Sequence, residues 1–167
     1  MAIEKIVQDM DKSLIVMRNA ANWLEKSGKK ITKWWKPENL NKEFLLQYTK
    51  PEEYYVLLVD DEPAASVVIQ YQQNGQDWKP VDKGNPKPAY YVHWGCVTRK
   101  FAGTKKIDLM INFAEQIALS KNIKTLRADN DADEIKLREM CERLGFHLVK
   151  IIKEDYRNTA LYEKELP

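Results

Sequence analysis

The sequence predicts a mixed α/β fold, with a central sheet of about seven strands and four helices. Two observations support it: some segments have the β-branched and aromatic composition of strands, and others have apolar residues at helical spacing. A third is their order, in which strands and helices alternate without an internal repeat. Such an order is typical of one sheet covered by helices.

Length and composition predict a single globular domain over residues 1–167. Of the 167 residues, 44% are hydrophobic and 31% are charged, which is enough apolar surface for a core. Lys and Arg number 27 and Asp and Glu 25, so the formal net charge is +2 and the two signs are mixed along the chain. A nucleic-acid-binding protein usually has a stronger basic stripe, so no nucleic-acid partner is expected.

The two cysteines, Cys96 and Cys141, lie far apart and outside any CxxC or Cys/His cluster. No structural zinc site is therefore expected, and no metal. The N-terminal segment lacks the basic start and apolar run of a signal peptide, and no stretch has the length of a membrane span. These features favour a protein of the reducing cytoplasm, without a membrane partner.

The first part of the chain is expected to form a strand and two helices. Ile3–Gln8 has strand composition, and Ser13 is the expected N-cap of an amphipathic helix that ends at Gly28. A basic connection with Trp34 and Trp35 leads to a second helix. Apolar residues at helical spacing mark both helices: Leu14, Met17, Ala21 and Leu24 in the first, and Leu40, Phe44 and Tyr48 in the second.

A hairpin and a long loop are expected next. Tyr54–Val59 and Ala64–Tyr71 have strand composition, and Asp60–Pro63 between them has turn composition. The segment from Gln72 to Ala89 cannot sustain a helix or a central strand, because of its many turn residues: Asn74, Gly75, Pro80, Gly84, Asn85, Pro86 and Pro88. Such a loop is either a functional lid or the mobile tip of a hairpin.

The second half contains the remaining strands and helices. The expected elements are a strand over Tyr90–Thr98, a turn over Arg99–Thr104, a helix with Ile107, Met110, Ala114 and Ile117 on its apolar face, and strands over Lys124–Asp129, Phe146–Lys153 and Thr159–Lys164. A last helix is expected before the final two strands. Asp131 and Glu134 have the spacing of its capping box, and Gly145 ends it.

Two segments of this second half resemble the GNAT superfamily of acetyltransferases. Residues 91–107, Tyr-Val-His-Trp-Gly-Cys-Val-Thr-Arg-Lys-Phe-Ala-Gly-Thr-Lys-Lys-Ile, resemble the family's fourth strand and pyrophosphate loop, which often ends in F-A-G-K-G-x-G. Leu126-Arg127-Ala128-Asp129 and Leu144-Gly145-Phe146 resemble its later pattern, L-R-L-D followed by L-G-F. The resemblance covers nearly the whole chain. It implies a mostly antiparallel sheet that is splayed between strands 4 and 5.

The resemblance implies acetyl-coenzyme A as cosubstrate, bound by that strand and loop. In the family the fourth strand carries a bulge and leaves backbone groups free for the pantetheine arm, and the following turn presents N–H groups and a helix N-terminus to the diphosphate. The residues at these positions are Cys96, Val97 and Thr98 on the strand, and Ala102, Gly103, Thr104, Lys105, Lys106 and Ile107 in the loop.

The loop departs from the family at two positions where glycine is usual, because Lys105 and Ile107 occupy them. A side chain at these positions obstructs the close approach of backbone to phosphate. Lys105 and Lys106 bring two ammonium groups to the same place, which offsets part of that loss. The alternative is that both lysines are solvated residues at the start of the helix.

Cys141 is the first candidate catalytic residue. In many family members a tyrosine five residues before the Phe of Leu-Gly-Phe protonates the departing thiolate, and Cys141 has that position. A thiol is acidic enough for this step, with a reference pKa of about 8.5, although its side chain is shorter than that of tyrosine. The alternative is a small buried residue on an apolar helix face.

His93 is the second candidate. It lies four residues before Val97 on the expected fourth strand, on the same face as Tyr91. Some arylalkylamine acetyltransferases of the superfamily place histidines at these two strand positions to relay the proton of the amine, and His93 matches the second. An imidazole suits that role. The alternative is a core histidine bonded to backbone, while His147 is expected to be an ordinary surface residue.

Four aromatic residues are candidates for the acceptor pocket. Trp34 and Trp35 lie in the connection that often lines this pocket in the family, Trp78 lies in the long loop, and Tyr91 lies beside His93. Aromatic walls suit an amine. The alternative is that the tryptophan pair before Pro37 anchors a loop on the core.

These features predict an acetyl-coenzyme A-dependent N-acetyltransferase in which the neutral amine of a small molecule attacks the thioester directly. The alternative is a non-catalytic GNAT-like module that binds a coenzyme A species or a protein partner, and the missing loop glycines and tyrosine favour it. A nucleic-acid-binding protein is the third class, and it rests on the mild positive charge alone. The acceptor and homodimerisation are left open by the sequence.

Overall fold

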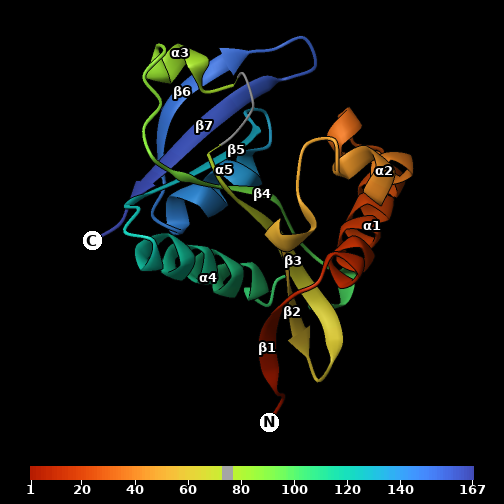
Figure 1. Cartoon of the computed structure of the whole chain (residues 1–167). Helices are drawn as coiled ribbons and strands as arrows, with labels where there is room; N and C mark the ends of the chain where they lie inside the picture. Colours follow the sequence, from red (N-terminus) through yellow and green to blue (C-terminus); the bar gives the residue numbers. More distant parts are fainter. Residues whose placement is uncertain (73–76) are drawn as a thin grey trace. The chain divides into compact units, whose positions relative to one another are not determined.

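The computed structural model describes residues 1–72 and 77–167, in which it has seven strands and five α-helices (Figure 1). The strands are β1 (Glu4–Gln8), β2 (Tyr54–Val59), β3 (Glu62–Tyr71), β4 (Tyr90–Val97), β5 (Thr125–Asp131), β6 (His147–Lys153) and β7 (Asn158–Glu165). The helices are α1 (Met10–Lys26), α2 (Lys42–Leu45), α3 (Lys79–Asp82), α4 (Lys106–Ser120) and α5 (Ile135–Arg143). Single 3₁₀ turns are η1 (Lys33–Trp35), η2 (Pro37–Asn39), η3 (Pro51–Glu53) and η4 (Arg99–Phe101). The mixed fold and the seven strands predicted from the sequence are confirmed.

The strands form one sheet in the order β1-β2-β3-β4-β5-β7-β6. The β1–β2, β2–β3, β5–β7 and β6–β7 pairs are antiparallel, whereas β4 runs parallel to β5. The β4–β5 pairing covers Tyr90–Val92 and Leu126–Ala128 and then ends, although both strands continue. An early end of this ladder is the pairing pattern expected of the splay between strands 4 and 5 that the family resemblance implies.

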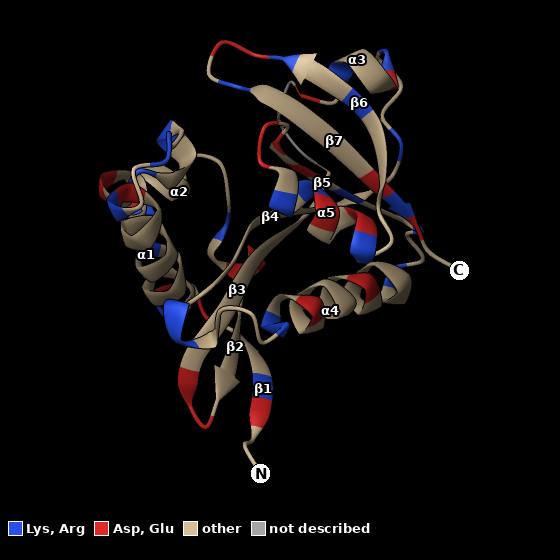
Figure 2. Cartoon of the chain, turned by 180° about the vertical axis from the view of Figure 1, so that it is seen from behind, with Lys and Arg blue, Asp and Glu red and all other residues tan. Residues whose placement is uncertain are grey.

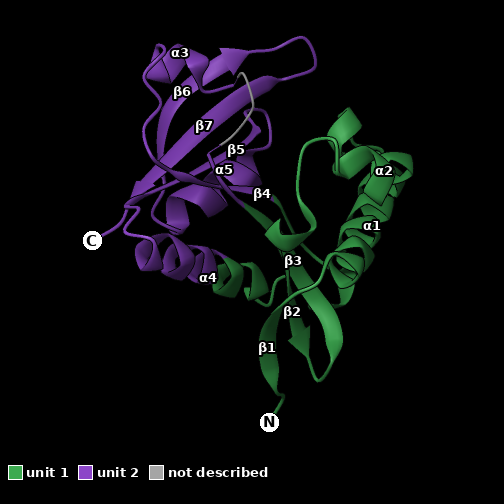
Figure 3. Ribbon diagram, viewed as in Figure 1, with its two compact units in different colours: residues 1–69, 94–110 green, residues 70–93, 111–167 purple. Residues whose placement is uncertain are grey.

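The chain forms two compact units (Figure 3). Unit 1 consists of residues 1–69 and 94–110, and unit 2 of residues 70–93 and 111–167. Each unit combines separate stretches of the chain. The single-domain organisation expected over residues 1–167 stays a prediction. No helix within the described residues is long and apolar enough to span a membrane.

Helix α1 supplies much of the core of unit 1. Its buried residues include Leu14, Met17 and Ala21, which pack in one cluster with Tyr54 and Val68 of the sheet. Apolar residues at this spacing form one helix face, so the predicted amphipathic helix is confirmed. Its predicted start is wrong, because the cap lies one turn earlier.

Asp9 is the N-cap of α1. Its Oδ1 accepts a hydrogen bond from the N–H of Lys12 at 3.0 Å, which satisfies one of the unpaired donors of the first turn. Ser13, the N-cap expected from the sequence, is instead fully buried inside the helix. The helix ends before Gly28, which has a φ of 75°. Glycine adopts this conformation without strain, whereas residues with a side chain do not.

The hairpin of β2 and β3 is confirmed. Asp60 (φ 48°) and Asp61 (φ 66°) form its two-residue turn. Two successive residues with positive φ match the right-handed twist of the flanking strands, and aspartate tolerates this conformation better than most residues do.

The segment between β3 and β4 differs from the expected loop. It contains α3, and Trp78 directly before this helix is buried. The composition predicts no helix here, but one helical turn is short enough to accommodate Pro80 near its start, where the missing N–H costs nothing. Asn74 and Gly75, which contribute to the loop prediction, lie outside the described residues.

Helix α5 begins later than its capping box predicts. Glu134 precedes the first helical residue, Ile135, and its side chain makes no cap, so the expected Asp131–Glu134 box is wrong. Asp131 belongs to the end of β5 and accepts from the N–H of Asp133. The predicted end is confirmed, because Gly145 follows the helix with a φ of 92°.

Candidate active site

Trp94 has a left-handed backbone in the middle of β4, with a φ of 49°. A bulky residue in this region is strained, so its surroundings must hold it there. The indole Nε1 of Trp94 donates to the carbonyl of Trp34 at 2.9 Å, and the two rings meet edge to face with 6.0 Å between their centroids. These contacts, within unit 1, stabilise an irregularity on the strand that carries a bulge in the family.

The end of β4 holds the predicted pantetheine residues. Cys96 and Val97 are half-buried, and the N–H of Thr98 donates to the carbonyl of Ala64 at 2.9 Å, so this donor is already paired. Cys96 packs against two apolar clusters of unit 1. Burial raises the pKa of its thiol to about 12, which keeps it protonated and unsuited to act as a nucleophile.

The loop after β4 presents several backbone N–H groups for which the described part of the chain provides no acceptor. It passes through Gly103 (φ 78°) and Lys105 (φ 59°) before α4 begins. Loop carbonyls accept from the N–H groups of Ala102, Thr104 and Asp108. Within the described residues, no acceptor is found for the N–H groups of Gly103, Lys105, Lys106 and Ile107. Such groups, at the start of a fifteen-residue helix, form a binding site for an anion.

The φ of Lys105 gives a physical reason for the glycine that the family has at this position. Glycine adopts a positive φ without a steric cost, whereas lysine keeps the same turn at a cost of about 1 kcal/mol. The side chain of Lys105 is exposed, and the start of α4 is correspondingly basic in Figure 2. Lys105 therefore adopts a backbone conformation that favours glycine.

Ile107 lies against the backbone of β4. A Cβ placed on Gly95 would lie 3.4 Å from Cδ1 of Ile107, so the isoleucine side chain occupies the space that the glycine leaves. Both residues belong to unit 1. The second departure from the family thus has a packing partner of its own.

His93 lies beside Asp129 on the paired strands β4 and β5. Their neighbours Val92 and Ala128 are register partners, and His93 Nδ1 is 3.4 Å from Asp129 Oδ1. The side chains are 16% and 10% exposed. Arg157 Nη2 is 2.5 Å from the second oxygen of Asp129. Burial alone would raise the pKa of Asp129, but His93 and Arg157 outweigh it and bring the pKa to about 2, so the carboxylate is ionised at neutral pH.

Neither Asp129 nor Arg157 is among the site residues predicted from the sequence. Asp129 is part of the Leu-Arg-Ala-Asp segment that resembles the family, but its partner depends on the register of two strands that are distant in sequence. Arg157 comes from the turn between β6 and β7, 28 residues later. The sequence signal that could have indicated Asp129 is the alternation of side chains along β5, which places Arg127 and Asp129 on one face.

Two further carboxyl groups belong to this part of unit 2. Burial and a hydrogen bond with Glu154 raise the pKa of Asp77 to about 7. Burial opposes ionisation of Glu154 too, but hydrogen bonds from Asp77 and Thr159 lower its pKa. The two side chains therefore share one proton below about pH 7, and Asp77 carries it.

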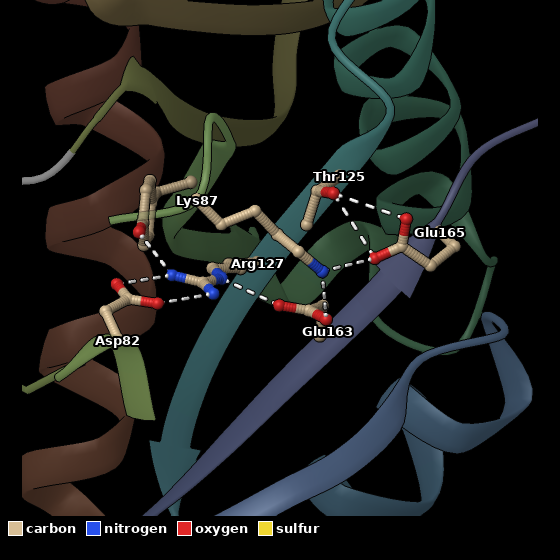
Figure 4. Close-up of polar contacts among 7 residues, drawn as sticks. Asp82, Lys87, Thr125, Arg127, Glu163 and Glu165 are labelled. Atoms are coloured by element: carbon tan, nitrogen blue, oxygen red, sulfur yellow. Dashed lines mark hydrogen bonds and ion pairs between the residues drawn. The ribbon is translucent and has the colours of Figure 1, made fainter. Parts of the chain in front are cut away.

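Arg127 joins α3 to the sheet of unit 2 (Figure 4). Its guanidinium donates to both oxygens of Asp82 at 2.9 Å each, to Glu163 at 2.8 Å and to the hydroxyl of Tyr91 at 2.9 Å. The side chain is 2% exposed. Lys87 pairs with Glu163 as well, so the segment between β3 and β4 is attached to the sheet at two points.

Trp78 and Tyr91 are buried in unit 2, each 3% exposed. Their rings meet edge to face, 6.1 Å apart, and the guanidinium of Arg127 lies 4.0 Å from the centroid of Trp78. Both rings therefore take part in core packing around Arg127, and their role in an acceptor pocket stays a prediction.

Trp34 and Trp35 have different environments in unit 1. The ring of Trp34 is half-buried and contacts the rings of Phe44 and Tyr48 at 6.0 and 4.8 Å between centroids. Trp35 packs against the core cluster of α1. Trp34 thus belongs to an aromatic group with an exposed member, Tyr48, whereas the packing of Trp35 favours the alternative interpretation of an anchor on the core.

Cys141 is 6% exposed and lies on the inner side of α5. Its Sγ accepts a hydrogen bond from Asn130 Nδ2 at 3.3 Å. Burial, which outweighs this hydrogen bond, raises the pKa of the thiol to about 11. Proton transfer from so weak an acid to a coenzyme thiolate costs free energy. These features therefore favour the structural interpretation of Cys141. His147 is exposed.

The predicted site residues divide between the two units. Unit 1 contains the candidates for coenzyme binding and the tryptophan pair: Trp34, Trp35, Cys96, Val97, Thr98 and the loop residues 102–107. Unit 2 contains the candidate catalytic residues and the other two aromatic residues: His93, Cys141, Trp78 and Tyr91. Strand β4 passes from one set to the other, since His93 and Trp94 are consecutive on it.

Solved structures of acetyltransferases resemble the chain over nearly its whole length. A GNAT-family acetyltransferase from Listeria monocytogenes 4b F2365 is 24% identical with a TM-score of 0.70, and the match covers 99% of this chain and 95% of that one. The PaiA N-acetyltransferase from Thermoplasma acidophilum, in complex with coenzyme A, is 15% identical with a TM-score of 0.70 over 98% and 99%.

The NatC complex bound to a Gag peptide and CoA is 11% identical, with a TM-score of 0.64 over 99% of both chains. No protein-family model and no curated protein matches the sequence. At these identities the likeness establishes the fold and leaves the activity to the residues of the site. The chain therefore has the fold of the GNAT acetyltransferases.

Proposed function

We propose that the protein is an acetyl-coenzyme A-dependent N-acetyltransferase that acts on the amine of a small molecule. The observation that carries the proposal is the loop after β4, where the N–H groups of Gly103, Lys105, Lys106 and Ile107 have no acceptor among residues 1–72 and 77–167, at the start of α4. Unpaired N–H groups at a helix N-terminus suit the diphosphate of a coenzyme. The positive φ of both Gly103 and Lys105 supports the same use.

The chain would supply binding and proton transfer in this reaction. Acetyl-coenzyme A provides the acyl thioester. The backbone at Cys96 and Val97 would hold the pantetheine arm, and the loop at 102–107 the diphosphate. As the C–N bond forms and the C–S bond breaks, the amine loses a proton to Nε2 of His93, and water returns one to the thiolate. Water is preferred to Cys141 because of the raised pKa of that thiol.

Coenzyme binding is tested by thermal unfolding. Free coenzyme A is expected to raise the melting temperature, because a ligand that binds only the folded state stabilises it, by about 2.7 kcal/mol at a concentration of 100 times Kd. Pantetheine, which lacks the diphosphate, is the matched control and is expected to have a much smaller effect. A melting temperature that coenzyme A leaves unchanged at millimolar concentration would contradict the proposal.

Turnover is tested with acetyl-coenzyme A and a panel of primary amines, by following release of the free thiol. In the wild type, kcat/KM is expected to fall at acidic pH as the base becomes protonated, and His93→Gln is expected to abolish this acidic limb. His147→Gln is the control. An unchanged limb in His93→Gln assigns the base elsewhere.

A non-catalytic module that binds a coenzyme A species is the second candidate. The raised pKa of Cys141, at the position of the family's acid, favours it. A clear thermal shift with coenzyme A, together with no thiol release above the rate without protein for any amine, would select this function.

A further inference from the structure

The two carboxylate oxygens of Asp129 have different partners. Oδ2 accepts from Nη2 of Arg157 at 2.5 Å, and Oδ1 faces Nδ1 of His93 at 3.4 Å. Oδ1 is buried, and within the described residues it has no conventional hydrogen bond. A buried carboxylate oxygen without a donor is costly, so the imidazole at 3.4 Å is the group placed to satisfy it.

Arg157 is held in place by the turn on which it lies. Its Nε donates to Thr159 Oγ1 at 2.9 Å, and its carbonyl accepts from the N–H of Glu154 at 2.9 Å. Thr159 is fully buried on β7 and donates in turn to Glu154. The guanidinium is therefore a fixed partner for Oδ2, which leaves Oδ1 directed at His93.

The imidazole of His93 is restrained on its face as well. Tyr91 stacks on it with 6.4 Å between the centroids and 14° between the ring planes, and the Tyr91 hydroxyl accepts from buried Arg127. Tyr91 and His93 are two residues apart on β4, and their partners Arg127 and Asp129 are two residues apart on β5. The nearly parallel ring of Tyr91 favours this orientation of the imidazole, and Asp129 lies on the side of its Nδ1.

We propose that Asp129, held by Arg157, is a positioning residue that fixes His93 as the Nδ1–H tautomer, in which Nε2 is the basic nitrogen of the ring. The inference rests on the proposed role of His93 and deepens it. An Asp129 carboxylate beside Nδ1 also stabilises the imidazolium that forms when Nε2 takes the proton.

Asp129 itself does not take that proton. Its pKa of about 2, which His93 and Arg157 bring about against the effect of burial, keeps it ionised. Other titratable groups that interact with Asp129 or Arg157 are Asp77 and Glu154, which share a proton below about pH 7, and Tyr156 and Cys141. A carboxylate that stays charged orients the imidazole without competing with it for the proton.

Nitrogen-15 NMR of the imidazole rings tests the proposal without any substrate. Long-range proton–nitrogen correlations at a pH where the rings are neutral distinguish the two tautomers. The chain has two histidines, so exposed His147 is an internal control. The wild type is expected to hold His93 predominantly as the Nδ1–H form, whereas His147 shows the mixture of an exposed ring. A His93 signal dominated by Nε2–H would overturn the proposal.

Asp129→Asn is the first variant. Its amide N–H₂ can donate to Nδ1, so His93 is expected to change to the Nε2–H tautomer. Asp133→Asn, which makes the same change on an exposed residue four positions later, is the matched control and is expected to leave both histidines unchanged. If a folded Asp129→Asn protein keeps the wild-type tautomer, the positioning role is refuted.

Arg157 provides a second pair of variants that keep Asp129. Arg157→Met is expected to lower the Nδ1–H share of His93, because Oδ2 loses the partner that orients the carboxylate. Arg157→Lys retains a cation and is expected to restore most of that share. Equal spectra for the wild type and a folded Arg157→Met protein would refute the part assigned to Arg157.

Kinetics separate this inference from the proposed function. If acetyl transfer is found, Asp129→Asn is expected to lower kcat about 100-fold while KM for acetyl-coenzyme A stays unchanged, because the coenzyme contacts are elsewhere. The tautomer measurements require no turnover. Should they agree with expectation while no amine is acetylated, the positioning of His93 stands and the proposed function fails.

Discussion

Lys106 is paired with the carboxylate of Glu4 on β1. Both residues belong to unit 1, and the lysine side chain is 21% exposed. Lys105, the residue before it, is exposed, and within the described residues no ion pair is found for it. Of the two ammonium groups that the sequence brings to the loop, Lys105 is therefore the one available to a diphosphate.

Replacing Lys105 separates its charge from its backbone strain. Lys105→Ala removes the ammonium group but keeps a Cβ at φ 59°, whereas Lys105→Gly removes both. If the ammonium contacts phosphate, both variants bind coenzyme A more weakly than the wild type at low salt, and the difference shrinks as salt increases. Titration calorimetry at two salt concentrations measures it. Tighter binding by Lys105→Gly alone, at every salt concentration, would show that the side chain obstructs the loop.

The same pair of variants is expected to differ in stability. Lys105 precedes α4 and is not part of it, so glycine relieves a left-handed strain there and does not weaken the helix. Urea unfolding is expected to show Lys105→Gly to be more stable than Lys105→Ala by about 1 kcal/mol. A less stable glycine variant would contradict the backbone strain assigned to Lys105.

Asp9 and Ser13 test the start of α1. Asp9→Ala removes the cap that pairs with the N–H of Lys12 and is expected to cost about 1 kcal/mol of unfolding free energy. Ser13→Ala removes a buried hydroxyl that has no hydrogen-bond partner within the described residues, so it is expected to be neutral or stabilising. Urea unfolding of both variants measures this, and a larger loss in Ser13→Ala would contradict the assigned cap.

Arg127→Met is expected to be among the most destabilising single changes in unit 2. It leaves the carboxylates of Asp82 and Glu163 without their buried partner, which costs about 3–5 kcal/mol. Lys87→Met is the control, because Lys87 is 43% exposed and its pairing with Glu163 is worth at most about 1 kcal/mol. Similar losses in the two variants, measured by urea unfolding, would show that the Arg127 network is not the main attachment of α3.

The elements of the fold could be predicted because local patterns determine them. The apolar spacing of α1, the two aspartates of the β2–β3 turn and Gly145 after α5 each act within a few residues. The cap of α1 was predicted wrongly because Asp9 and Ser13 are both good N-cap residues, and burial decides between them. The residue types alone do not show which of the two side chains is buried in the folded protein.

The candidate site could be predicted only in part for a similar reason. The coenzyme loop is continuous in sequence, so a family resemblance places it, although the φ of Lys105 does not follow from the residue type. The partners of His93 come from β5 and from the turn before β7, and they follow from strand register. Helix α3 was not predicted because its stability comes from the ion pair of Asp82 with Arg127, 45 residues away.

Asp77→Asn tests the proton shared with Glu154. The folded-state pKa of Asp77, raised to about 7 by burial and by Glu154, lies above its unfolded value of 3.8. The folded protein therefore binds the extra proton between these pH values, and the associated stability is complete below pH 3.8 and is lost as the pH rises through about 7. Asparagine imitates the protonated acid, so its unfolding free energy is expected to fall less than that of the wild type between pH 5 and pH 8. Urea unfolding at both pH values measures the difference, with exposed Asp133→Asn as the control that keeps the wild-type fall. Parallel behaviour of Asp77→Asn and the wild type would show that the two carboxyl groups ionise separately. Removing a carboxyl group that shares a proton must change how the unfolding free energy depends on pH.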